Sequence, residues 1–331
     1  MDRTRRLRDR QILETVPTSL IQTLKRQKYH LVGNHSAVKK CRWLHETLVH
    51  GRPCYKQRFY GIKTRQCIQM TPNLFNCTQR CLFCWRAQSG DLNLKWDEMK
   101  LPEWDSSEEI VDSDIRAQRQ ILTGYKANPE TDMRKLKEAL TPRQAAISLT
   151  GEPTLYKRLG ELIRTFHKRN FTTFLVSNGT VPSALAKLSE EPSQLYISVC
   201  GPDEKTFERV CRPETTKAWE RLNETLSLLP SFRCPTVIRI TLTRDLNMKN
   251  PEGYAKLIKK SNPTYIEPKA YMHVGFSKLR MSFENMPSHL EIRQFGLQLV
   301  RETGYDLIGE SEESRVVLLS KLKKPISFEN T

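Results

Sequence analysis

The chain has 331 residues, and 54 Lys and Arg against 37 Asp and Glu give it a formal net charge of +17. Its mean hydropathy is −0.57, and no apolar run approaches the ~20 residues of a membrane span. This composition excludes a membrane protein and indicates either one large α/β domain with extensions or two smaller domains. Because polar and basic residues follow Met1 where a signal peptide would be apolar, we expect a cytoplasmic protein.

The first 65 residues are basic, with aromatic side chains interleaved. The basic residues run from Arg3 to Arg65, and the aromatic ones are Tyr29, Trp43, Tyr55, Phe59 and Tyr60. Phosphates bind Lys and Arg, and aromatic rings stack on exposed bases, so this segment predicts a folded RNA as partner. A basic surface that serves only solubility stays open as the alternative.

Three cysteines, Cys41, Cys54 and Cys67, form an array in and just after this segment, with twelve residues between successive members. Such wide spacing cannot form one local loop, so these thiols can bind one metal or cluster only if folding brings them together. Taken alone, the residues are typical of ordinary buried thiols. In a cytosolic chain, nine cysteines indicate metal ligands or catalytic groups rather than disulfides.

From about residue 66, short apolar or β-branched segments alternate with helical patterns. Strands are predicted at 67–70, 145–149, 172–176, 195–199, 236–242 and 265–271, and helices at 155–169, 215–229 and 253–260. This alternation indicates βαβ units and a parallel sheet. Because no G-x-G-x-x-G opens a helix, we predict an α/β fold of the incomplete (β/α)6 TIM-like barrel type rather than a doubly wound sheet.

The loop after the first strand carries Cys77, Cys81 and Cys84 in a C-x₃-C-x₂-C pattern, with Phe83 before the last cysteine. Three thiolates on one tight loop can hold three irons of a 4Fe–4S cluster and leave the fourth iron open. A zinc loop is the alternative, but it needs a fourth ligand and a second pair downstream. No such pair follows Cys84, so the pattern favours the iron–sulfur cluster.

The acidic segment 94–114 is predicted to be a solvated loop that leads into a helix from Glu108, capped by Ser106 or Ser107. At the C-terminus we predict a helix over 288–303 and then a hairpin of 305–309 and 315–319. That hairpin should pack on the sheet or its open edge. The predicted domains are a basic N-terminal cap (1–65), the barrel (66–287) and a C-terminal extension (288–331).

Candidate binding residues lie at the ends of three successive predicted strands: Gly151 and Glu152 follow one strand, Ser177 and Asn178 follow the next, and Ser198 lies near the end of the third. In a β/α barrel the functional groups lie at the carboxyl ends of the strands. A carboxylate there can accept bonds from an ammonium group, and hydroxyl or amide groups can hold ribose hydroxyls. Each residue alone is equally typical of a strand-to-helix turn.

With these motifs, the chain resembles the radical S-adenosylmethionine (SAM) superfamily, and within it the archaeal-type 4-demethylwyosine synthases, which form a tRNA wyosine base. The resemblance covers most of the chain and is carried by the loop at 77–85, the polar strand ends and the strand at 195–199. It implies that Cys77, Cys81 and Cys84 hold a 4Fe–4S cluster whose open iron binds SAM. It also implies that SAM is contacted by Phe83, Gly151, Glu152, Ser177, Asn178 and Ser198.

The resemblance implies further that Cys41, Cys54 and Cys67 hold a second 4Fe–4S cluster and that Lys56 forms a Schiff base with pyruvate. An amine must be neutral to attack a carbonyl, and a buried cationic neighbourhood lowers its pKa toward neutrality. The remaining cysteines, Cys200, Cys211 and Cys234, are interpreted as structural.

The implied reaction converts 1-methylguanosine beside the anticodon of tRNA(Phe) into 4-demethylwyosine, with two carbons taken from pyruvate. The first 65 residues contain no phosphate-binding loop of a flavin module, so we expect an external electron donor such as flavodoxin or ferredoxin, and a monomer. Two alternatives stay open: another radical SAM RNA methylase or methylthiotransferase, and a zinc-containing RNA-binding protein.

Overall fold

A computed structural model describes residues 16–329 and contains one ten-stranded sheet in the order β1-β2-β3-β4-β5-β6-β7-β8-β10-β9. The basic run at residues 3–10 lies outside the described residues. The central strands are parallel: β3 (Cys67–Thr71), β4 (Gln144–Ile147), β5 (Thr172–Ser177), β6 (Gln194–Ser198), β7 (Thr236–Leu242) and β8 (Tyr265–Ala270). All six predicted strands are confirmed, with ends within two residues of the prediction.

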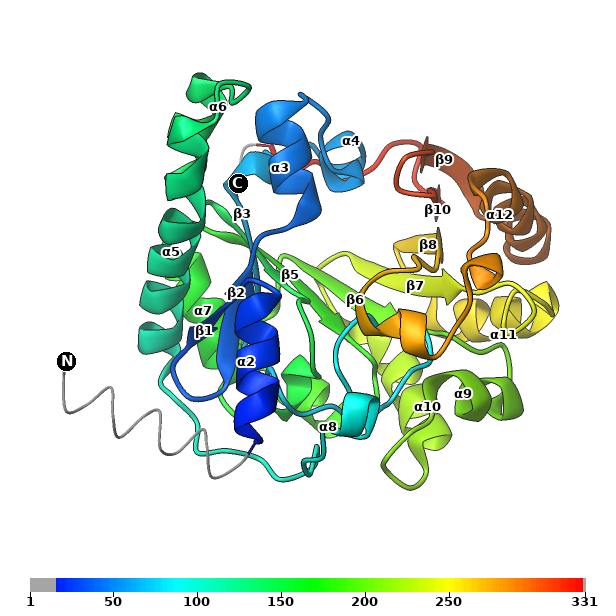
Figure 1. Cartoon of the computed structure of the whole chain (residues 1–331). Coiled ribbons are helices and arrows are strands. Elements are labelled where there is room, and N and C mark those ends of the chain that lie inside the picture. Colours follow the sequence, from blue (N-terminus) through cyan, green and yellow to red (C-terminus); the bar gives the residue numbers. More distant parts are fainter. Residues whose placement is uncertain (1–15, 330–331) are drawn as a thin grey trace.

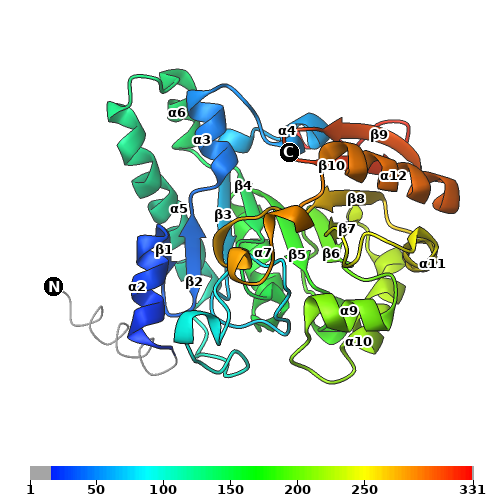
Figure 2. The same ribbon diagram turned by 45° about the vertical axis from the view of Figure 1, so that its right-hand side comes forward.

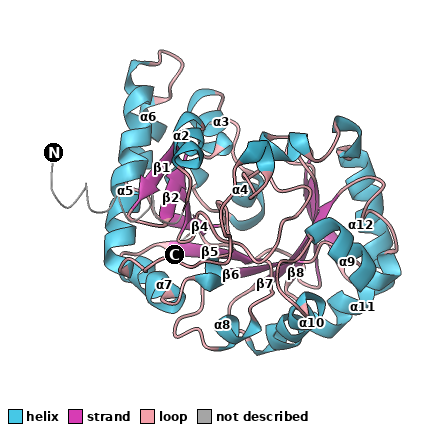
Figure 3. Cartoon of the chain, turned by 60° about the horizontal axis from the view of Figure 1, so that its bottom comes forward, coloured by secondary structure: helices cyan, strands magenta, loops and turns pink. Residues whose placement is uncertain are grey.

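These strands form an arc with helices on its outer side, which confirms the incomplete barrel (Figure 1 and Figure 3). The helices between and after the strands are α5 (Ser107–Thr123), α6 (Met133–Ala139), α7 (Leu159–Lys168), α8 (Pro182–Ala186), α9 (Glu204–Cys211), α10 (Ala218–Leu228), α11 (Pro251–Ser261) and α12 (His289–Thr303). Among residues 16–329, no helix is long and apolar enough to cross a membrane.

Antiparallel hairpins extend the sheet at both edges. The C-terminal hairpin of β9 (Asp306–Ser311) and β10 (Val316–Ser320) pairs with β8, which confirms its predicted place at the open edge. At the other edge, β1 (Tyr29–Val32) and β2 (Ser36–Lys39) form a hairpin on β3 that was not predicted. One sheet therefore runs through all three predicted domains, and the boundaries between those domains stay a prediction.

The N-terminal segment also contributes α2 (Thr18–Arg26), α3 (Arg42–Val49) and α4 (Tyr55–Tyr60). Figure 2 shows α3 and α4 toward the same end of the molecule as β9 and β10, with α9 and α10 toward the opposite end. The inner side of the arc therefore lies between these two groups of elements.

Side-chain alternation along the strands builds two apolar cores. Leu175 on β5 belongs to the outer core between the sheet and its helices. Its neighbour Phe174 belongs to the inner core, together with Tyr196 of β6 and with Tyr55 and Tyr60 of α4. The short helix α4 thus packs its aromatic rings against the inner side of the arc. Its other side chains are thereby brought close to the inside of the barrel.

The prediction of a fully solvated loop at 94–114 is wrong in part. Glu98 is only 2% exposed and pairs with Arg86, and Asp114 on α5 is fully buried. The start of the helix is confirmed, since Ser106 caps α5 and forms a reciprocal capping box with Glu109. The acidic composition of this segment predicted that its carboxyl groups are exposed, but those of Glu98 and Asp114 are buried.

Candidate active site

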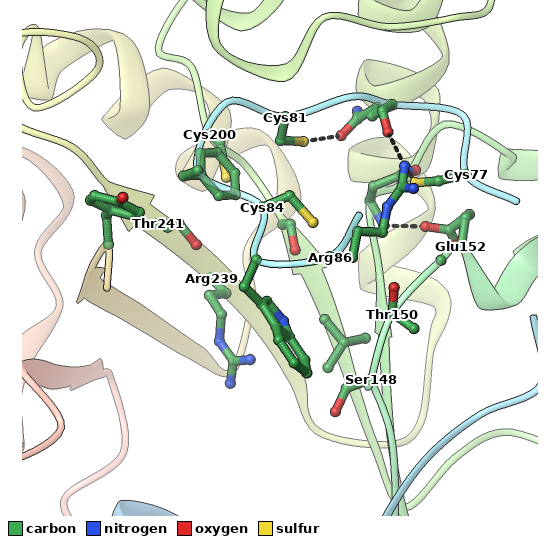
Figure 4. Close-up of a pocket in the computed structure, with 18 of the residues that line it drawn as sticks. Cys77, Cys81, Cys84, Arg86, Ser148, Thr150, Glu152, Cys200, Arg239 and Thr241 are labelled. Carbon is green, nitrogen blue, oxygen red and sulfur yellow. Dashed lines mark hydrogen bonds between the residues drawn. The ribbon is translucent and has the colours of Figure 1, made fainter. Parts of the chain in front are cut away.

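A cavity of about 310 Å³ opens between the cysteine loop and the carboxyl ends of β4 to β8 (Figure 4). Nine residues that the sequence singled out line this one cavity: Cys77, Cys81, Phe83, Cys84, Gly151, Glu152, Ser177, Asn178 and Ser198. The structure therefore brings together the predicted first-cluster ligands and the predicted SAM contacts, as expected for groups at the carboxyl ends of barrel strands.

The cysteine loop is fastened to the end of α9 by backbone hydrogen bonds. The amide of Arg80 donates to the carbonyl of Cys211 over 3.1 Å, and the amide of Leu82 donates to that of Val210 over 2.9 Å. Within the loop, the amide of Cys84 donates to the carbonyl of Cys81. These bonds fix the backbone of a segment that has no regular secondary structure.

Arginine side chains hold the loop from within. Arg86 is 4% exposed, donates to the carbonyl of Gln79 over 3.0 Å and forms an ion pair with Glu98 over 2.6 Å. Arg280 donates to the carbonyl of Cys84. Burial raises the pKa of the Cys77 and Cys84 thiols, whereas the charge of Arg86 lowers it. Arg86 thus favours the thiolate form that iron binds.

The strand end at Gly151 requires glycine. Its φ is +69°, and a Cβ atom there would lie 1.8 Å from the carbonyl oxygen of Asn73. This close approach turns the chain so that the next residue, Glu152, lies 1% exposed at the cavity wall.

The Glu152 carboxylate is held by several donors. It accepts hydrogen bonds from the Ser177 hydroxyl over 2.8 Å, the Asn178 amide over 2.8 Å and the Thr154 hydroxyl over 2.6 Å. Burial raises the pKa of Glu152, and these hydrogen bonds oppose that rise. The carboxylate is therefore oriented before any ligand enters.

Asn178 and Ser177 also have partners within the protein. The Asn178 side-chain amide donates to the Thr78 hydroxyl over 2.8 Å, which ties the end of β5 to the cysteine loop. The Ser177 hydroxyl accepts from the Gly179 amide over 3.0 Å in addition to its bond with Glu152. These two residues position the loop and the carboxylate, and their contacts with SAM stay a prediction.

The donor set at the cavity fits a 4Fe–4S cluster. Among the described residues, no group of three His, Cys, Asp or Glu side chains is arranged to hold a single metal ion. In a cubane each cysteine binds a different iron, so the three thiols need not converge on one point. Cys77, Cys81 and Cys84 share one cavity wall, and the charge of Cys81 raises the pKa of both other thiols.

The second cysteine set also converges. Cys41 precedes α3, Cys54 precedes α4 and Cys67 begins β3. Burial raises the pKa of the Cys54 and Cys67 thiols to about 12, and the charge of Cys41 contributes to both rises. Three thiols spread over 27 positions in the sequence are thus electrostatic neighbours in the fold.

Lys56 lies in the first turn of α4, beside this cysteine set. Its Nζ is 4.3 Å from the ring centroid of Phe174 and 4.5 Å from that of Tyr196. Burial and the nearby Arg239 lower the pKa of Lys56 to about 8, whereas Glu267 and the thiols oppose that shift. A substantial fraction of the amine is therefore neutral near pH 8.

Three charged residues inside the barrel were not predicted from the sequence. Arg239 of β7 and Lys269 of β8 line the cavity, and Glu267 of β8 is fully buried. Arg239 pairs with Glu267 over 2.7 Å. A charged residue within an otherwise apolar buried strand is the sequence signal that could have revealed them.

An aromatic platform lies at another part of the cavity wall. Trp85 lines the cavity and stacks on Tyr29 with centroids 6.1 Å apart. The Lys39 Nζ lies 4.8 Å from the Trp85 ring and 4.2 Å from that of Tyr29. Cys200 is a further lining residue, and the Cys211 thiol beside it lowers its pKa.

Two family models match the chain. Residues 74–258 match the radical SAM superfamily, and residues 260–321 match a family described as wyosine base formation. The second match covers β8, α12 and the whole C-terminal hairpin, which lie outside the first.

Relatives with a named activity span nearly the whole chain. A SAM-dependent tRNA 4-demethylwyosine synthase of Pyrococcus abyssi is 47% identical over 311 residues, which cover 92% of this chain and 90% of that protein. The enzyme of the same name from Methanocaldococcus jannaschii is 39% identical and is covered to 99%. The rice protein of that name is 34% identical, and the match covers 47% of its length.

Two solved structures share the fold. A structure described as TYW1 with a lysine–pyruvate adduct bound superposes with a TM-score of 0.85 at 38% identity, over 95% of this chain and 99% of that one. A crystal structure of archaeal TYW1 gives a TM-score of 0.77 at 34% identity, over 94% and 99% of the two chains.

Proposed function

The chain belongs to the family of SAM-dependent tRNA 4-demethylwyosine synthases within the radical SAM superfamily, and we propose that it converts 1-methylguanosine in tRNA(Phe) and pyruvate into 4-demethylwyosine. The observation that carries this proposal is the cavity shared by Cys77, Cys81, Cys84 and the polar strand ends. The match to the wyosine-formation model excludes the zinc-containing RNA-binding alternative and disfavours another RNA methylase or methylthiotransferase.

The first cluster and SAM belong in this cavity. Cys77, Cys81 and Cys84 would hold the cluster, Phe83 would pack beside it, and the oriented carboxylate of Glu152 would accept from the ammonium group of SAM. Ser198 lines the same wall and offers a hydroxyl to the ribose. When bound, the cluster and SAM supply the radical that abstracts hydrogen from the N-methyl group of 1-methylguanosine.

Lys56 is assigned to pyruvate. Its amine would add to the keto carbon while the keto oxygen leaves as water, so that nitrogen and carbon form an imine. The lowered pKa of Lys56 supports this role, as does the lysine–pyruvate adduct described for a structural relative. Cys41, Cys54 and Cys67 would hold a second 4Fe–4S cluster beside it, supported by their convergence in the fold.

The tRNA is proposed to dock with its modified base at Trp85. An unstacked purine recovers stacking energy on an aromatic ring, and the adjacent Lys39 supplies positive charge for a neighbouring phosphate. Electrons are proposed to come from a separate donor such as flavodoxin or ferredoxin, and the protein is proposed to act as a monomer.

Anaerobic reconstitution tests the function. The protein is incubated with SAM, reductant, pyruvate and tRNA(Phe) that carries 1-methylguanosine, and the nucleosides are analysed by mass spectrometry. We expect 4-demethylwyosine, and a mass increase of two labelled carbons with uniformly ¹³C-labelled pyruvate. Cys84→Ala should abolish the product, whereas Cys234→Ala, at a thiol outside the cavity, should not. Product formation without pyruvate would contradict the proposal.

A further inference from the structure

Lys269 faces the floor of the cavity from β8. Side chains alternate along a strand, so Lys269 and Glu267 share the inner side of the arc. The Lys269 Nζ donates to the Ser314 carbonyl over 2.6 Å and lies 5.0 Å from the ring centroid of Tyr55. The turn of the C-terminal hairpin and the helix α4 thus hold this ammonium group in place.

The neighbouring carboxylate is already neutralised. Glu267 accepts from Arg239 over 2.7 Å and from the Tyr60 hydroxyl over 2.8 Å. Among the described residues, Lys269 has no ion-pair partner within 4.0 Å, and its Nζ donates to a backbone carbonyl instead. Burial and the charge of Arg239 together lower the pKa of Lys269 to about 8, while Cys54 and Glu267 oppose the shift.

A cation inside a protein is costly unless an anion accompanies it. One ordered hydrogen bond to a carbonyl leaves two protons of the ammonium group for a ligand in the cavity. The Lys56 Nζ and the Arg239 guanidinium lie over the same ring, 4.5 Å and 4.4 Å from the centroid of Tyr196. Arg239 also donates over 2.6 Å to the hydroxyl of Tyr55, the residue whose ring lies 5.0 Å from the Lys269 Nζ, so the two amines share one neighbourhood. Pyruvate presents a keto carbon to one amine and a carboxylate one bond away.

We propose that Lys269 binds the carboxylate of the 2-oxo acid whose keto group reacts with Lys56, and so selects a 2-oxo acid over a neutral ketone. This inference rests on the proposed function. Lys269 is then a substrate-binding residue rather than a second nucleophile. Because Glu267 is paired with Arg239 over 2.7 Å, its carboxylate is already engaged beside Lys269.

The test compares pyruvate with methyl pyruvate, which keeps the ketone and lacks the negative charge. The reconstituted full-length protein is incubated with each compound and reduced with borohydride, and the adduct is located by peptide mass mapping. The variants are Lys269→Met and Lys269→Arg. The control is Lys321→Met, because Lys321 also contacts a ring (Tyr305, 4.9 Å) and one oxygen but lies outside the cavity.

We expect Lys269→Met to raise the pyruvate concentration for half-maximal trapping by about 10- to 100-fold. This is the effect expected from the loss of one charge-assisted hydrogen bond. Trapping by methyl pyruvate should stay unchanged, Lys269→Arg should restore much of the preference for the acid, and SAM affinity should stay at the wild-type value. Lys321→Met should behave as wild type.

Equal losses with both compounds, a loss of SAM affinity of the same size, or an adduct on Lys269 itself would overturn the inference. These outcomes are distinct from failure of the proposed function. If the proposed function fails, the wild-type protein forms no adduct with pyruvate and makes no tricyclic nucleoside, and both proposals fall. Iron content and circular dichroism show whether Lys269→Met has a folding defect. If it is misfolded, Lys269→Arg tests the inference in its place. Loss of the preference for pyruvate over methyl pyruvate in Lys269→Arg also overturns the inference.

Discussion

Arg86 and Glu98 form a buried ion pair with 2.6 Å between Nη2 and the carboxylate, immediately after the last cysteine of the loop. Both side chains are at most 5% exposed. The same guanidinium donates to the Gln79 carbonyl, and the same carboxylate accepts from the Ser89 amide. The pair therefore links the two ends of the loop that carries the three thiols.

Arg86→Met should destabilise the protein strongly, because it removes the close partner of the buried Glu98 carboxylate and leaves it the more distant Arg80, 3.8 Å away. Breaking a buried pair in this way costs about 3–5 kcal/mol. Urea unfolding of the protein before cluster reconstitution measures the loss. Arg233→Met is the matched control, since the Arg233 side chain is 94% exposed and 3.8 Å from Glu191, and it should show no measurable loss. Similar losses in the two variants would contradict the role of the pair.

Asp114 should make stability depend on pH. Neither of its carboxyl oxygens has a hydrogen-bond partner in the described part of the chain, and burial raises its pKa well above the usual 3.8. The folded protein therefore holds a proton that the unfolded chain loses, so Asp114 lowers stability as pH rises above about 4. Relative to wild type, Asp114→Asn should gain up to about 1.4 kcal/mol per pH unit until the folded-state pKa is reached.

Chemical unfolding at several pH values between 4 and 8 tests this prediction. The two proteins should be nearly equal at the acid end, where Asp114 is protonated in both states. Asp112→Asn, on the same helix with a half-exposed side chain, is the control and should show no such trend. A constant difference between wild type and Asp114→Asn across this range would show that Asp114 does not titrate on unfolding.

The strands and the first site could be predicted because their signals are local. Apolar runs bounded by turn residues marked β3 to β8, and Cys77, Cys81 and Cys84 lie within one short loop. What was missed depends on tertiary contacts. Arg239 and Lys269 are ordinary charged residues in the sequence, and only closure of the barrel around α4 makes them neighbours of Lys56. Likewise, the partners that accompany the buried Glu98, among them Arg86 and the Ser89 amide, are brought to it by the folded loop.

The two cysteine sets should each hold one cluster. Reconstituted wild type should contain about eight irons, roughly four per cubane. Replacing Cys77, Cys81 and Cys84 together should leave about half the iron, because the second set is untouched. It should also abolish SAM cleavage, because the cluster that binds SAM is lost. Iron and sulfide analysis measures the first effect and 5′-deoxyadenosine release the second. Unchanged iron in this triple variant would remove the first set as a cluster site.

The basic N-terminal segment should bind tRNA through phosphates. Replacing Lys25, Arg26 and Lys40, all exposed, with Gln should weaken tRNA binding and reduce the slope of log affinity against log salt. Each lost phosphate contact reduces that slope by about 0.7–0.9. Filter binding at several salt concentrations gives the slope. The control replaces the exposed lysines of α11 (Lys256, Lys259 and Lys260), and equal effects of the two sets would point to charge alone rather than to a docking face.

Lys56→Arg should separate charge from nucleophilicity. Arginine keeps the positive charge beside Phe174 and Tyr196 but stays protonated, so it cannot form an imine with pyruvate. The variant should retain iron content and tRNA affinity, lose the borohydride-trapped adduct, and make little or no tricyclic nucleoside. SAM cleavage should continue without product, because the cavity of Cys77, Cys81 and Cys84 is unchanged. Lys63→Arg, at an exposed lysine nearby, should keep full activity. If Lys56 only bound a phosphate, arginine would substitute well, so product formation by Lys56→Arg at the wild-type rate would rule out the imine while leaving the radical SAM assignment intact.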